Sequence, residues 1–221
     1  MNDIDIHHIS VPRTARVATA GKLSSETKYI WIACHGYGEI ASEFIQSMQS
    51  IVDDSTYVVA PEALSRFYWG GNFDGKPVAS WMTREDRLNE IKDYSNYLSL
   101  VLDDVLSKAS EQVKIILLGF SQGSATVARW VNAKHPKCHA MVIWAGMIPE
   151  DIEYEQAYYS HVNLYCRYGD EDRFINADRV VQHQALMDQK GLTFQMEAFP
   201  GKHKIYSEPL KALATKIYNA I

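Results

Sequence analysis

Short runs of consecutive apolar residues alternate along this chain with longer segments in which apolar residues recur every third or fourth position. A run that is apolar at consecutive positions predicts a strand covered on both faces, because a strand with one wet face alternates apolar and polar residues. Strands are predicted on this basis at residues 29–34, 56–60, 113–118, 140–144, 162–168 and 193–199. Residues 4–11 and 16–20 are predicted to pair as a hairpin around Pro12, Arg13 and Thr14.

Helical periodicity fills most of the segments between the strands. One face of a predicted helix carries Ile40, Phe44, Ile45, Met48, Ile51 and Val52. An apolar stripe from Leu88 to Leu106 predicts a long amphipathic helix. Further helices are predicted after Gly123 to about residue 135, at 176–189 and at 207–220. Residues 62–84 lack a clear period and predict a long ordered loop.

The order of strands and helices indicates an α/β fold. Strands that alternate with helices and are covered on both faces form a mostly parallel central sheet with helices on both sides. No repeat, low-complexity tract or linker divides the sequence. We therefore expect a single domain over residues 1–221.

Composition and charge narrow the possible partners and the compartment. The 221 residues are 47% apolar and carry a net charge of −5, without a basic run, so nucleic acid is not expected as a partner. The three cysteines are odd in number and far apart, which favours a reducing compartment. The first residues do not form a signal peptide, and no apolar run is long enough to span a bilayer. We expect a cytoplasmic protein without stable membrane insertion.

The most specific motif follows the predicted strand 113–118. Gly119-Phe120-Ser121-Gln122-Gly123 matches the pattern G-x-S-x-G, in which a serine nucleophile sits on a sharp turn between a strand and a helix. Glycines suit the flanking positions, since side chains there would collide with the neighbouring strand and helix. The alternative interpretation is a glycine-bounded turn with a surface serine.

A serine hydroxyl is a weak nucleophile and needs a base. In this arrangement the acid and then the histidine follow the serine in the chain. Among the downstream histidines, His203 lies in a loop after the last predicted strand. His135 and His139 flank Pro136 at a helix end. His183 lies in a predicted helix, where we expect it on the surface or partly packed. The acid is expected in Gly169–Asp172, directly after the strand 162–168, although a solvated acidic turn is the alternative.

The tetrahedral intermediate of acyl transfer needs two hydrogen-bond donors for its oxyanion. The backbone N–H of Gln122, the residue after the nucleophile, is one candidate. The second is expected in the loop His35-Gly36-Tyr37-Gly38 after an earlier strand, with the N–H of Tyr37 as the best candidate. His35 itself is expected to be a structural hydrogen-bonding residue.

These motifs resemble, in order and spacing, the phospholipase/carboxylesterase family of α/β-hydrolases, which includes acyl-protein thioesterases and small bacterial carboxylesterases. The resemblance rests on His35–Gly38, Gly119–Gly123, Ala145–Pro149, Gly169–Asp172 and His203, and extends from about residue 28 to the C-terminus. It implies the α/β-hydrolase fold, Ser121 as nucleophile, Asp172 as the acid that orients the base, and His203 as the base. It likewise implies Tyr37 and Gln122 as oxyanion donors.

The sequence departs from the family pattern near the expected substrate pocket. Met82 and Thr83 follow Trp81 where an aromatic residue and an aspartate are usual, and Arg173 replaces a proline after the catalytic aspartate. These changes argue against long-chain protein or phospholipid substrates. The expected pocket walls are Phe67, Trp69, Trp81, Met82 and Met147. They predict small or medium acyl substrates, although the alternative for residues 63–84 is a segment that only covers the core.

The resulting hypothesis is a cofactor-free serine hydrolase that cleaves carboxylic esters of small molecules through an acyl-enzyme, as a monomer or homodimer. Thioesterase or lysophospholipase activity on long acyl chains is the alternative within the family. A non-catalytic binding protein with the same fold is a second alternative, disfavoured because binding does not require the serine, acid and histidine together. A metal site is not expected, since His7 and His8 have no acidic residues at ligand spacing.

Overall fold

A seven-stranded sheet forms the centre of the computed structural model, which describes residues 4–71 and 73–221. Its spatial order is β1-β3-β2-β6-β7-β8-β9. The strands are β1 Val17–Ala20, β2 Tyr29–Cys34, β3 Thr56–Pro61, β6 Lys114–Phe120, β7 Ala140–Trp144, β8 Asn163–Gly169 and β9 Phe194–Phe199. All neighbours pair in parallel except β1, which is antiparallel to β3. The α/β class and the mostly parallel sheet are confirmed.

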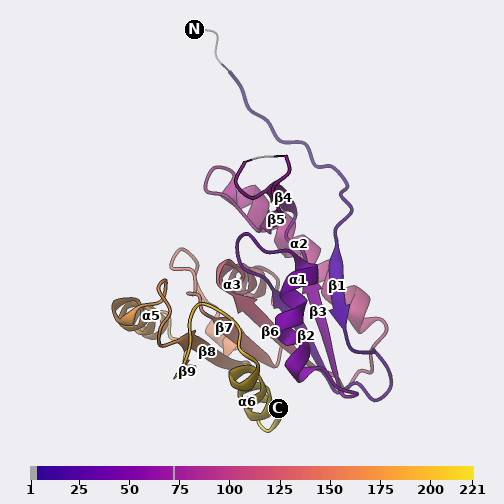
Figure 1. Cartoon of the computed structure of the whole chain (residues 1–221), viewed down its shortest axis with the longest axis vertical. Helices are drawn as coiled ribbons and strands as arrows, with labels where there is room; N and C mark the ends of the chain where they lie inside the picture. Colours follow the sequence, from indigo (N-terminus) through magenta and orange to yellow (C-terminus); the bar gives the residue numbers. More distant parts are fainter. Residues whose placement is uncertain (1–3, 72) are drawn as a thin grey trace.

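Helices cover both faces of the sheet (Figure 1). They are α1 Ala41–Phe44, the 3₁₀-helix η1 Ile45–Ile51, α2 Arg87–Leu106, α3 Gln122–Lys134, α4 Gln156–Tyr159, α5 Ala177–Gln189 and α6 Ser207–Tyr218. Side chains from α2, α3 and α5 pack on one face, and those from α1, η1 and α6 on the other.

Strand β2 shows why the strands are apolar at consecutive positions. Ile30 and Ile32 point into the core beneath α2 and α3, whereas Trp31 and Ala33 point into the core beneath η1 and α6. All four side chains are fully buried. Because neither face of the strand meets water, no polar residue interrupts the run.

The segment 40–52 forms less α-helix than its periodicity predicts. One α-helical turn, α1, passes directly into the 3₁₀-helix η1. The Ser47 hydroxyl donates to the Phe44 carbonyl at 2.7 Å, so it competes with the backbone N–H groups that an α-helix would direct to that acceptor. The predicted apolar face is nevertheless buried, with Phe44, Ile45 and Met48 in the core.

The predicted loop at residues 62–84 contains a hairpin that its mixed composition obscured. Strands β4 Ser65–Tyr68 and β5 Pro77–Ser80 pair in antiparallel register. Four-residue strands with a glycine-rich connection give too few positions for an alternating pattern to be recognised. Residue 72 of this segment, like residues 1–3, lies outside the described residues.

The predicted N-terminal hairpin is wrong. Residues 4–16 form no strand, and β1 pairs with β3 instead. Figure 1 shows this segment leading away from the body of the molecule, and Ile4, Ile6 and Ile9 are at least 75% exposed. The apolar pattern was misleading because this segment packs on nothing that would bury it.

Two structural features bear on the compartment predictions. Cys34 and Cys166 are free thiols buried within β2 and β8, as expected for small core residues. Within the described residues, no helix combines the length and apolar character that are needed to cross a membrane.

Candidate active site

Ser121 lies on a sharp turn between β6 and α3. Its backbone has φ 52° and ψ −115°, outside the region that helix and strand residues adopt. The turn is held from below, since the Ser121 N–H donates to the Trp144 carbonyl at 2.9 Å and the Ser124 hydroxyl donates to the Gly119 carbonyl at 2.7 Å. This strained turn lifts the serine out of the strand and directs its hydroxyl toward the cavity.

Close packing at the turn requires both flanking glycines. A Cβ on Gly119 would lie 2.3 Å from the Gly123 carbonyl oxygen. A Cβ on Gly123 would lie 2.1 Å from the carbonyl oxygen of Cys34 in β2. Both distances are well inside van der Waals contact with backbone atoms that cannot rotate away, so the predicted collision with strand and helix is confirmed.

His203 and Asp172 reach Ser121 from two separate loops. The Ser121 hydroxyl lies 2.9 Å from His203 Nε2, and Asp172 Oδ2 lies 2.7 Å from His203 Nδ1. A carboxylate only accepts hydrogen bonds, so Nδ1 carries the proton and Nε2 is left to accept from the hydroxyl. The loop after β8 supplies the acid and the loop after β9 supplies the histidine, at the carboxyl ends of neighbouring parallel strands.

Asp172 and Asp170 have different partners. The Asp172 side chain is fully buried, and its second oxygen accepts from the backbone N–H groups of Phe174 and Ile175 at 2.7 and 3.1 Å. Asp170 instead accepts from the Gly201 N–H at 2.9 Å, which joins the two loops. Asp172 is therefore the acid that contacts the histidine, and Asp170 is a brace between the loops.

Two aromatic rings enclose the imidazole. The centroids of Phe120 and Phe174 lie 5.1 and 4.7 Å from that of His203. The ring is only 19% exposed as a result. These contacts limit its rotation and keep water from one side of it. The sequence did not single out either phenylalanine, although Phe120 directly precedes Ser121 and Phe174 lies two residues after Asp172.

A cavity of about 1150 Å³ opens in front of Ser121. Its walls include Tyr37, Trp69, Met147 and Phe174, and it extends to η1 and to the start of α6. It exceeds the roughly 300–1000 Å³ that ligand sites ordinarily provide. The arrangement offers a nucleophile at the floor of a mixed polar and apolar groove.

Only some of the residues that were predicted to form the pocket wall line the cavity. Trp69 and Met147 line the cavity, whereas Phe67, Trp81 and Met82 are absent from its wall. Trp81 is a core residue, 2% exposed, whose indole N–H donates to the His35 carbonyl at 2.8 Å. Phe67 contacts Tyr37 and Trp69 with tilted rings, and Met82 packs near Arg129. The direction of each side chain decides which residues line the cavity. The composition of the segment does not reveal that direction.

Both predicted oxyanion donors lack an acceptor among the described residues. Neither the Tyr37 N–H nor the Gln122 N–H is hydrogen-bonded to an acceptor in residues 4–71 and 73–221. The Gln122 side chain is engaged elsewhere, since its amide accepts from the Trp81 N–H at 3.1 Å and donates to the Met82 carbonyl at 3.1 Å. It thereby ties the start of α3 to the segment after β5.

His35 is buried and serves the loop that contains Tyr37. Its ring bonds to the Gly36 carbonyl at 2.7 Å through Nδ1, and Nε2 accepts from the Ala63 N–H at 3.0 Å. Burial lowers its pKa and favours the neutral ring that these contacts require. The expected structural role is confirmed.

Among the other histidines, His183 differs most from its expected position. His183 is fully buried and accepts from the Ile148 N–H at 2.9 Å, so the surface assignment was wrong. Burial lowers its pKa to about 4. His139 is half-buried and accepts from the Ile115 N–H at 3.1 Å, whereas His135 is exposed. His8, on the extended N-terminal segment, lies 3.2 Å from Asp86.

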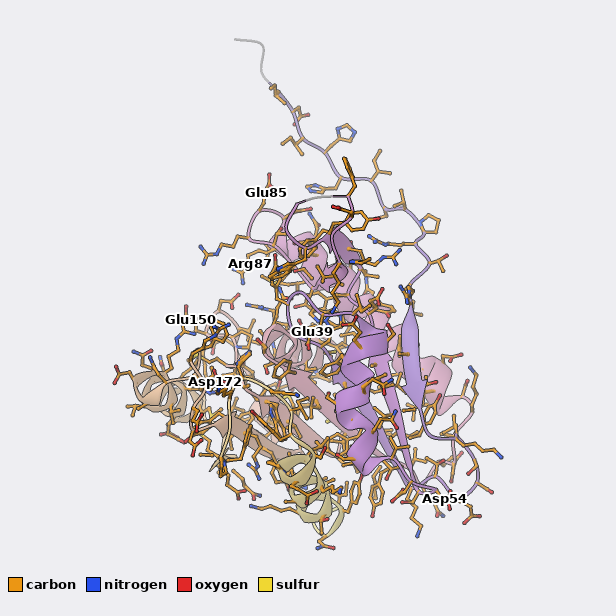
Figure 2. All side chains as sticks on the ribbon, viewed as in Figure 1. Glu39, Asp54, Glu85, Arg87, Glu150 and Asp172 are labelled. Carbon is orange, nitrogen blue, oxygen red and sulfur yellow. The ribbon has the colours of Figure 1, made fainter. Side chains whose placement is uncertain are left out.

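Glu39 is a site residue that sequence reasoning missed. It lines the cavity with Ser121 and His203, and Figure 2 labels it in the loop that leads into α1. Burial raises its pKa. The signal was an acidic residue directly after the glycine loop 35–38. No cluster of three or more potential metal ligands occurs in the described part of the chain.

Comparison with known proteins identifies a matching family. A family model described as Phospholipase/Carboxylesterase matches residues 17–221. No curated protein sequence matches the chain significantly.

Solved structures share the fold over most of the chain. Acyl-protein thioesterase 2 of Zea mays is 16% identical with a TM-score of 0.68, over 92% of this chain and 100% of that one. The carboxylesterase of Bacillus cereus is 12% identical with a TM-score of 0.68, over 94% of this chain and 95% of that one. At such identities the comparison establishes a common α/β-hydrolase fold.

Proposed function

This chain belongs to the phospholipase/carboxylesterase family of hydrolases, and from that premise we propose that it is a serine esterase that cleaves carboxylic esters through an acyl-enzyme. The observation that carries the proposal is the continuous hydrogen-bonded path from Ser121 through His203 to Asp172, with distances of 2.9 and 2.7 Å. Ester hydrolysis through an acyl-enzyme uses a nucleophile, a base and an orienting acid, and these three groups supply them.

In the proposed reaction, Ser121 attacks the ester carbonyl while His203 Nε2 takes the hydroxyl proton. Asp172 holds the Nδ1 proton and stabilises the imidazolium that forms. The N–H groups of Tyr37 and Gln122 donate to the oxyanion. His203 then protonates the departing alcohol, and a water molecule, activated by the same imidazole, releases the acid from Ser121.

The proposed natural substrate is a small ester with a short or medium acyl group. Trp69, Met147 and Phe174 give the cavity bulky apolar walls that support this choice. Its volume of about 1150 Å³ favours the second candidate, a long acyl chain as in a thioesterase or lysophospholipase. The acyl-protein thioesterase of Zea mays has a similar fold and is an example of the second candidate's class of enzyme.

A panel of p-nitrophenyl esters, from acetyl to the longest soluble acyl chain, tests both candidates. We expect kcat/KM to peak between about two and six carbons, since each methylene adds about 0.8 kcal/mol only while room exists for it. A steady rise to the longest chains would favour the second candidate.

The Ser121→Ala variant tests the catalytic assignment. Its kcat should fall by about a million-fold, as in related triads, while its thermal unfolding temperature stays near that of the wild type. Covalent labelling by a fluorophosphonate should be lost in parallel. An alanine variant that keeps a few per cent of the activity would remove Ser121 as nucleophile, and an inactive, unlabelled wild type would favour a binding protein.

A further inference from the structure

Two carboxylates that line the cavity, those of Glu39 and Glu43, have no role in the reaction proposed above, and Glu39 is the one bonded to the loop that carries Tyr37. Glu39 lines the same cavity as Ser121 and His203. Glu39 is half-buried, and a carboxylate withdrawn from water is unfavourable unless hydrogen bonds compensate for the lost solvent. The partner that Glu39 has found is a backbone group of the oxyanion loop, defined as residues 35–39.

The contact is short and local. Glu39 Oε2 accepts from the Gly36 N–H at 2.7 Å, within the range of charge-assisted hydrogen bonds. The same oxygen would lie 3.0 Å from a Cβ placed on Gly36, so the carboxylate packs directly against this peptide. The Glu39 side chain therefore closes the loop on itself.

Hydrogen bonds from the hairpin hold the far end of the loop. The Gly38 N–H donates to the Ala79 carbonyl at 3.0 Å, and the Ala79 N–H donates to the Glu39 carbonyl at 3.0 Å. The N–H groups on both sides of Tyr37 are thus consumed, that of Gly36 by Glu39 and that of Gly38 by β5. Between them, the Tyr37 N–H has no acceptor among the described residues and is available to a ligand in the cavity.

We propose that Glu39 is a positioning residue of the oxyanion site: by holding the Gly36 peptide, its carboxylate sets the direction of the Tyr37 N–H. This inference rests on the proposed esterase function. The peptides that carry the Gly36 and Tyr37 N–H groups share the Gly36 Cα, so once Glu39 holds the first peptide, only the φ and ψ of Gly36 can reorient the second. A preorganised donor needs no reorientation when the oxyanion forms.

The hydrogen bond, and not the negative charge, performs this role. A negative charge beside the oxyanion site opposes the charge that develops there. Glutamine at position 39 keeps an acceptor oxygen at the same reach without the charge. Methionine has a similar length and volume but only a weak acceptor. The two substitutions therefore separate hydrogen bonding from both charge and packing.

The test compares Glu39→Met and Glu39→Gln with the wild type on one p-nitrophenyl ester. We expect Glu39→Met to lower kcat about 10- to 100-fold with KM within about threefold, because a misdirected oxyanion donor affects the transition state more than the bound ester. Glu39→Gln should keep kcat within about fivefold. The rate of fluorophosphonate labelling at Ser121 should follow the same order, since the phosphoryl oxygen occupies the oxyanion site.

Glu90 provides the matched control. Its carboxylate accepts from the Thr83 N–H at 2.6 Å, outside the cavity, so Glu90→Met removes a comparable hydrogen bond away from the site. This variant should retain wild-type kcat. Thermal unfolding of all variants separates local from global effects, and Glu39→Ala replaces Glu39→Met if the latter does not fold.

Specific results would overturn the inference. Equal losses in Glu39→Met and Glu39→Gln would assign the effect to charge, and a kcat for Glu39→Met within twofold of wild type would remove the positioning role. Either result leaves the proposed function intact if the wild type is active and Ser121→Ala is not. Absence of Ser121-dependent activity in the wild type would instead overturn the proposed function.

Discussion

Asp170 and Asp172 are two residues apart and chemically identical, yet their environments give them separate tasks. Asp172 accepts from His203 and from two backbone N–H groups, whereas Asp170 accepts from the Gly201 N–H alone. An ionised carboxylate that accepts several hydrogen bonds has no freedom to turn away from its partner. Backbone N–H groups therefore fix the Asp172 carboxylate, and that carboxylate fixes the imidazole of His203.

We predict that Asp172→Asn damages catalysis far more than Asp170→Asn. An amide can donate to Nδ1 and so favours the wrong imidazole tautomer, which costs related triads about 10⁴-fold in kcat. Asp170→Asn keeps an acceptor for the Gly201 N–H and should cost less than about tenfold. Steady-state kcat values of the two purified variants decide the ranking, and the reverse order would move the orienting role to Asp170.

At the scale of elements, the turn between β6 and α3 depends on how closely α3 approaches β2. The first turn of α3 packs against the end of β2, and Gly123 marks the contact. This approach places the N-terminus of α3, with its free Gln122 N–H, beside the oxyanion loop. Packing of two elements thereby fixes the spacing between the two proposed donors.

We predict that Gly123→Ala destabilises the protein by about 3 kcal/mol or more. The added methyl would lie 2.1 Å from the Cys34 carbonyl oxygen, and the helix or the strand must shift to make room. Gly70→Ala is the control, since its Cβ would meet nothing within 4 Å and only its positive φ of 85° opposes alanine, at about 1 kcal/mol. Urea unfolding of both variants measures the difference, and equal losses would contradict the close approach.

At the scale of the whole molecule, the fold buries a titratable group that does not line the cavity. His183 on α5 accepts from the Ile148 N–H, with the Cys166 thiol 4.0 Å from its other nitrogen. Burial lowers the pKa of His183 to about 4, and it raises the pKa of Cys166 to about 12, so both groups stay neutral. The unfolded chain, in contrast, protonates histidine with a pKa near 6.5.

We therefore predict that stability falls as the pH decreases from about 6.5 toward 4. In this window the unfolded state binds the proton that folded His183 refuses, so acid favours unfolding. The contribution of His183 should amount to about 2 kcal/mol between pH 7 and pH 5. His183→Gln, which keeps an acceptor for the Ile148 N–H, should flatten the pH dependence by that amount in urea titrations. An unchanged slope would show that His183 is protonated in the folded state.

Much of this architecture could be predicted from the order of residues alone. Consecutive apolar residues in β2, β6 and β7 report burial on both faces, and that condition holds only in a sheet covered by two helical layers. The motif around Ser121 indicates a sharp turn by itself, because backbone contacts at that turn leave room only for glycine at the flanking positions. The chain order then limits the histidine to the loop after the last strand.

The tertiary structure decided what depends on contacts between distant segments. The two acids at positions 170 and 172 could be distinguished in sequence only by resemblance to a family, whereas the loop contacts of His203 distinguish them directly. Trp69 and Trp81 are both tryptophans of the same aromatic-rich segment, but Trp81 packs in the core and Trp69 lines the cavity. Glu39 has a role only because its carboxylate reaches back to Gly36. Periodicity reports whether a residue is buried, and the direction of a side chain from a loop is set by the segments that pack around it.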